Sequence, residues 1–91
     1  MAAIPPRAEL VAGVIDIVVR MALERGIEIS AADLSESSNV RDFDLDSMDQ
    51  VAILNEIEDA WRVTMDDDSV RGGNNIGGLV DALVAALAAK Q

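Results

Sequence analysis

The stretch that decides the fold is DLDSMDQVAILNEIEDAW, residues 44–61. Acidic and turn-forming residues give way in it to an amphipathic pattern, which predicts a loop followed by a helix from Ser47 to about Trp61. Asp46 or Ser47 can cap this helix, with carboxylates near its positive end. The sequence therefore predicts an exposed serine hydroxyl among carboxylates, at the point where a helix begins.

Ser47 has no base within the chain to activate it, because the sequence contains neither histidine nor cysteine. A self-activating nucleophile needs a base within hydrogen-bond reach. Ser47 is therefore a poor candidate for a catalytic nucleophile. It is a better candidate for a residue to which another enzyme attaches a group.

The predicted helix has two different faces at about 100° per residue. The apolar face, expected to be buried, carries Val51, Ile53, Leu54, Ile57 and Trp61. The opposite face carries Met48, Ala52, Asn55, Glu56 and Asp59. An exposed, adaptable thioether among carboxylates suits a surface that docks a protein partner. An ordinary solvated face with one methionine fits the same geometry.

Two further helices are expected, one on each side of this one. Pro5-Pro6 can start the first, which runs to about Arg25 with Gly26 as its cap; its apolar stripe is Leu10, Val14, Ile17, Val18 and Met21. Asn74 or Asn75 can cap the last, whose stripe is Ile76, Leu79, Val80, Leu83, Val84 and Leu87.

The connections between these helices are long and polar. Residues 27–45 are rich in serine, with Ile29, Leu34, Val40 and Phe43 expected to pin them to the core. Asp66 to Arg71 allows one short helix before Gly72-Gly73. The prediction is an all-α bundle of three main helices and one short helix, with a tail at 1–7 and one domain at 8–89.

Composition limits the range of functions. The chain has 91 residues, 17 of them acidic and 7 basic, for a net charge of −10. Such a surface repels nucleic acid and anionic lipid and attracts basic protein surfaces. No signal peptide, membrane-spanning stretch or disulfide is expected. We therefore expect a cytoplasmic monomer.

Residues 40–49, VRDFDLDSMD, resemble the phosphopantetheine attachment motif of acyl carrier proteins, an Asp-Ser pair followed by Leu or Met at the start of the second helix. Val51, Leu54, Ile57 and Trp61 fall where that helix carries core residues. The helical pattern from about Leu10 to Leu87 fits the family's four-helix layout, so the resemblance covers nearly the whole chain. It implies the acyl-carrier-type four-helix bundle. It also implies a free-standing carrier that is not itself an enzyme.

The resemblance implies that a phosphopantetheinyl transferase attaches 4′-phosphopantetheine to Ser47, with Asp46 beside it. The arm then holds acyl groups as thioesters in a fatty-acid or polyketide-type pathway. Enzymes with basic docking surfaces that load, condense or transfer acyl groups would be the partners. The expected docking residues are Met48, Asp49, Ala52, Asn55, Glu56 and Asp59.

The sequence departs from the family at a few positions. Asp44 stands where glycine is common, and aspartate tolerates the left-handed backbone region that this turn needs. Ala52 and Asn55 replace an acid and an apolar residue that fatty-acid carriers often present. Gly73 stands where a core residue often closes the third helix. These departures favour a specialised carrier over the housekeeping one.

Other functions fit less well. Asp42, Asp44 and Asp46 have the spacing of a calcium loop, but Ser47 replaces its glycine and Ile53 its final glutamate. No cysteine or histidine is present to bind zinc. A peptidyl or aminoacyl carrier, and an unmodified acidic helical module in which Ser47 is only a cap residue, remain as alternatives. Loose binding of divalent cations by the aspartates also remains open.

Overall fold

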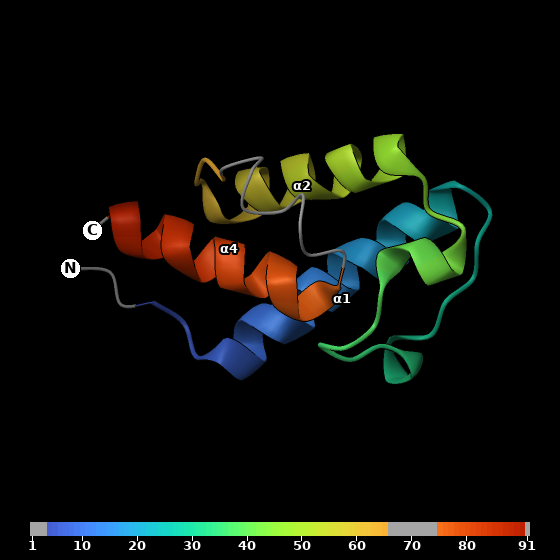
Figure 1. The fold of residues 1–91 in the computed structure, drawn as a ribbon, viewed down its shortest axis with the longest axis horizontal. Coiled ribbons are helices and arrows are strands. Elements are labelled where there is room, and N and C mark those ends of the chain that lie inside the picture. The colour runs from blue at the N-terminus through green and yellow to red at the C-terminus, as the bar shows by residue number, and fades with distance from the viewer. Residues whose placement is uncertain (1–3, 66–74, 91) are drawn as a thin grey trace.

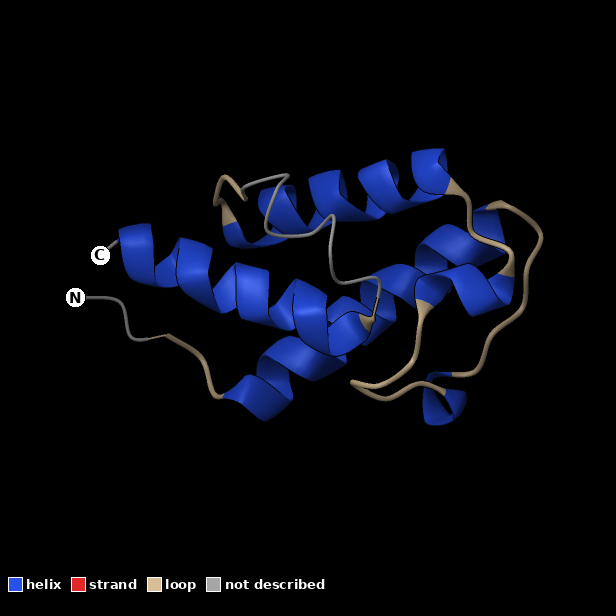
Figure 2. Cartoon of the chain, viewed as in Figure 1, coloured by secondary structure: helices blue, strands red, loops and turns tan. Residues whose placement is uncertain are grey.

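A computed structural model describes residues 4–65 and 75–90, which fold into a bundle of three main helices (Figures 1 and 2). In chain order the elements are α1 (Arg7–Glu24), the 3-10 helices η1 (Ala31–Asp33) and η2 (Val40–Phe43), α2 (Ser47–Trp61) and α4 (Ile76–Lys90). The predicted all-α fold is confirmed. The predicted short helix at 66–71 and Gly73 lie outside the described residues.

The core forms where the apolar stripes of α1, α2 and α4 meet. Leu10, Val14, Ile57, Ile76 and Leu83 are among its fully buried members. From the long connection Leu34 and Val40 are buried, while Ile29 and Phe43 pack partly buried against the core, as predicted. This pinning holds the polar segment between α1 and α2 against the helices.

Val51 is the one predicted core residue of α2 that the structure places outside. Its side chain is 57% exposed, whereas Ile53, Leu54 and Ile57 are buried and Trp61 is partly buried. Val51 lies about 60° around the helix from Leu54, at about 100° per residue. α2 therefore buries a narrower stripe than the sequence pattern indicates.

Two glycines have distinct roles in α1: Gly26 lets the helix end, and Gly13 lets another helix pack against it. The Gly26 N–H donates to Leu23 O and the Ile27 N–H to Ala22 O, so α1 ends in a Schellman motif with Gly26 at φ +79°. Within α1, a Cβ atom on Gly13 would lie 2.8 Å from two ring carbons of Trp61. Only glycine at this position lets the Trp61 ring lie against α1.

The start of α4 is bonded to the long connection. Asn75 caps α4, its Oδ1 accepting from the Gly78 N–H at 2.7 Å. The Gly77 N–H donates to Glu36 O at 2.8 Å, and the Ile76 N–H to Ser38 O at 3.0 Å. A Cβ atom on Gly77 would lie 3.1 Å from Glu36 O. Gly77, which weakens the first turn of this helix intrinsically, thus allows the connection to approach it.

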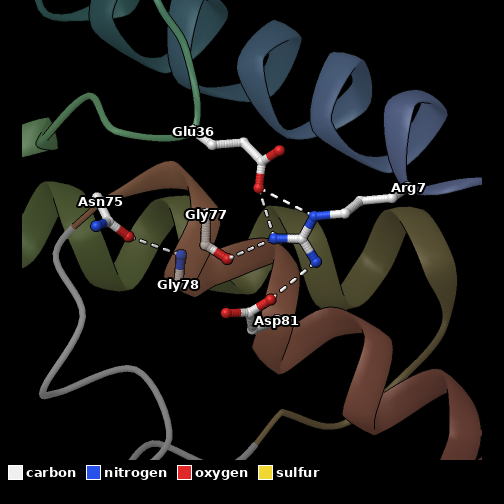
Figure 3. Close-up of polar contacts among 6 residues, drawn as sticks. All are labelled: Arg7, Glu36, Asn75, Gly77, Gly78 and Asp81. Carbon is white, nitrogen blue, oxygen red and sulfur yellow. Dashed lines mark hydrogen bonds and ion pairs between the residues drawn. The ribbon is translucent and has the colours of Figure 1, made fainter.

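The side chain of Arg7 joins α1 to both the long connection and α4 (Figure 3). Its Nε donates to Glu36 Oε1 at 3.0 Å, and its Nη1 lies 2.8 Å from Asp81 Oδ1. Its Nη2 also donates to Gly77 O at 3.5 Å. We call Arg7, Glu36 and Asp81 the Arg7 clamp. It ties the first residue of α1 to the connection and to α4.

Candidate functional site

Ser47 is placed by a tight turn between η2 and α2. Asp44 closes η2 in the left-handed region, with φ 63° and ψ 23°, and its N–H donates to Arg41 O. The predicted tolerance of Asp44 for this conformation is confirmed. Leu45 is then buried, which anchors the chain just before α2 begins. The turn therefore starts from a fixed point in the core and presents Ser47 at the surface.

Asp46 is the N-cap of α2, and Ser47 is the first residue of the helix. The Asp49 N–H donates to Asp46 Oδ1 at 2.9 Å, and the Asp46 N–H donates to Asp49 Oδ2 at 3.0 Å. These reciprocal bonds form a capping box, in which each side chain satisfies a backbone donor of the other residue. The box holds the backbone on both sides of Ser47.

Arg25, the C-cap of α1, contacts this turn from the neighbouring helix. Its Nη1 lies 3.4 Å from Asp49 Oδ1. The hydrogen bond from the Asp49 N–H lowers the pKa of the Asp46 carboxyl, and the positive charge of Arg25 and the Met48 N–H act in the same direction. Asp46 therefore remains ionised beside Ser47 well into the acidic range.

Asp49 differs from the other expected docking residues. It is only 7% exposed, and both of its carboxylate oxygens have partners within the fold. Much of the Asp49 charge is thus used within the fold, and its role in docking stays a prediction. The sequence does not reveal this, because nothing local indicates that Arg25 reaches Asp49.

The remaining docking candidates lie on the solvent side of α2. Met48 is 78% exposed, Asn55 and Asp59 are exposed, and Ala52 and Glu56 are half-buried. Val51 joins this surface through its exposure. Around Ser47 the face is thus mainly apolar, with the acids Glu56 and Asp59 farther along the helix. We call these six residues the outer face of α2.

The site suits an attached phosphate ester. The Ser47 side chain is exposed, and no hydrogen bond to another described residue holds its hydroxyl. Backbone N–H groups and the positive end of the helix dipole favour a negative group at this position. Within the described residues no helix could cross a membrane, and no group of three acidic, histidine or cysteine side chains could hold a metal ion.

Comparison with known proteins gives two matches. Residues 17–83 match the family described as a phosphopantetheine attachment site. Over 73 residues, 80% of this chain and 80% of the relative, the sequence is 36% identical to Acyl carrier protein 3 of Ralstonia nicotianae. With a helical bundle that presents a serine at the start of its second helix, the chain belongs to the acyl carrier protein family, whose members hold acyl groups on a covalently attached 4′-phosphopantetheine.

Proposed function

We propose that Ser47 is the residue that receives 4′-phosphopantetheine. The serine oxygen forms a bond to the phosphorus atom that bears pantetheine in coenzyme A. The pyrophosphate bond of coenzyme A breaks, and adenosine 3′,5′-bisphosphate leaves. The serine proton passes to a base of the transferase, since this chain offers no histidine or cysteine for that role. The carrier itself catalyses no step.

The observation that carries this proposal is the position of Ser47, exposed and first in α2, on a turn fixed by the capping box. A transferase needs a hydroxyl that projects into solvent from a defined backbone. Ser47 meets both conditions, and the residue beside it, the N-cap Asp46, carries a negative charge. The attached thiol would then lie outside the bundle, within reach of enzymes that load and transfer acyl groups.

The test is the mass of the intact protein after incubation with coenzyme A, magnesium and a promiscuous phosphopantetheinyl transferase. Wild-type protein should gain one phosphopantetheine, and Ser47→Ala should gain none. Thermal unfolding of the Ala variant serves as the control that it is folded. Modification of the Ala variant, or none of the wild type, would contradict the assignment; the second result would favour an unmodified interaction module.

We further propose that residues 8–89 act as a specialised carrier in a fatty-acid or polyketide-type pathway. The outer face of α2 supports this, because Met48, Val51 and Ala52 make the surface near Ser47 apolar. Glu56 and Asp59 still offer charge to a basic partner farther along the helix. A partner fitted to this face would combine an apolar contact near its active-site entrance with basic residues beyond it. A peptidyl or aminoacyl cargo remains the second candidate.

A further inference from the structure

Arg25 is connected to Ser47 through one buried carboxylate. Its guanidinium pairs with Asp49 Oδ1 at 3.4 Å, while Asp49 Oδ2 accepts the Asp46 N–H at 3.0 Å. Asp46 in turn caps the helix that Ser47 begins. The end of α1 is therefore coupled to the backbone of the modification site. Among the described residues, Arg25 is the only cation paired with a carboxylate of this turn.

The modification adds charge where negative charge is already concentrated. Asp46 and Asp49 lie on either side of Ser47 in the chain, and a phosphodiester on Ser47 would bring a third negative group to the first turn of α2. The helix dipole offsets only part of this, since it corresponds to about half an elementary charge. A neighbouring cation would offset more.

The position of Arg25 allows it to act on that added charge. Its side chain is 55% exposed, so the guanidinium is not enclosed by its contact with Asp49. Guanidinium has five N–H donors and binds phosphate and carboxylate oxygens with similar geometry. Arg25 can therefore keep its ion pair with Asp49 while much of its side chain stays open to solvent. Its charge already acts on the carboxylate of Asp46, the residue before Ser47.

We propose that Arg25 is a positioning residue for the modified site: it holds the capping box through Asp49 and stabilises the phosphodiester on Ser47 by charge. This inference rests on the proposed modification of Ser47. It distinguishes Arg25 from a residue that only supports the fold, because such a residue would stabilise the modified and unmodified proteins equally.

The experiment compares thermal or urea unfolding of both forms in wild type, Arg25→Gln and Arg25→Lys. Arg25→Gln should lower the folding equilibrium constant of the modified protein about two- to five-fold more than that of the unmodified protein, the range for an exposed charge pair. The excess should shrink as salt is added. Arg25→Lys retains the charge and should recover most of the difference.

Arg20→Gln is the matched control. Arg20 pairs with Asp16 within α1, at 3.2 Å, so its loss should affect both forms equally. Equal effects of Arg25→Gln on the two forms would overturn the inference while leaving the modification of Ser47 intact. So would Arg25→Lys behaving as Arg25→Gln. A wild-type protein that takes up no group at Ser47 would overturn both the inference and the proposed function.

Discussion

At the scale of single residues, the Asp46 carboxylate connects stability to pH. Its bond from the Asp49 N–H, aided by Arg25, gives it a lower pKa in the folded protein than in the unfolded chain. The charged form therefore contributes stability above the usual pKa of 3.8, and this contribution is lost as pH falls through the lowered folded pKa. Asparagine is an equally good N-cap but does not titrate in this range. The difference in urea midpoint between wild type and Asp46→Asn should be largest near neutral pH and shrink on acidification. A difference independent of pH would contradict this account.

At the scale of one element, the outer face of α2 should determine which enzymes accept the protein. Modified wild type should be elongated slowly by a complete bacterial fatty-acid synthase set, because the outer face of α2 has Ala52 where fatty-acid carriers often present an acid. Ala52→Glu should raise that rate, by up to the five- to thirty-fold that corresponds to about 1–2 kcal/mol for one interface contact. Ala60→Glu makes the same change at an exposed position two turns farther along α2 and should have little effect. Chain growth is followed by mass. Wild type elongated as fast as a housekeeping carrier, or an equal gain from both variants, would show that this face does not select partners.

At the scale of the whole molecule, the Arg7 clamp should hold the long connection against α4. Arg7→Gln removes contacts to Glu36 and Asp81, whereas Arg20→Gln removes one pair within α1. We expect faster amide exchange at Ile76 and Gly77 in the Arg7 variant, because their N–H groups donate to the connection. The Arg20 variant should exchange there as wild type does. Unchanged exchange in the Arg7 variant would mean that the backbone hydrogen bonds and the close contact at Gly77 hold the connection against α4 without the clamp.

The sequence predicts those features of the fold that depend on residues close together in the chain. The three helices follow from local periodicity, and the structure confirms them. Turn chemistry leaves Asp46 and Ser47 as cap candidates, of which the structure shows Asp46. The resemblance implies a left-handed turn that Asp44 tolerates, and the structure has it. The sequence does not predict contacts between distant residues. Nothing local indicates that Arg25 reaches Asp49 or that Gly77 meets Glu36. The exposure of Val51 also depends on distant residues. The apolar pattern of α2 does not show how much of its surface the other helices cover.

The packing of Trp61 on Gly13 gives the protein an optical reporter of its own. The chain contains a single tryptophan and no tyrosine, so its emission arises from one site. That site is the contact between α1 and α2, where the indole ring lies against a helix backbone. Intrinsic fluorescence therefore reports changes around the Trp61 ring, including loss of its contact with α1. It can follow unfolding of the unmodified, modified and acylated forms without a label that would disturb the outer face of α2.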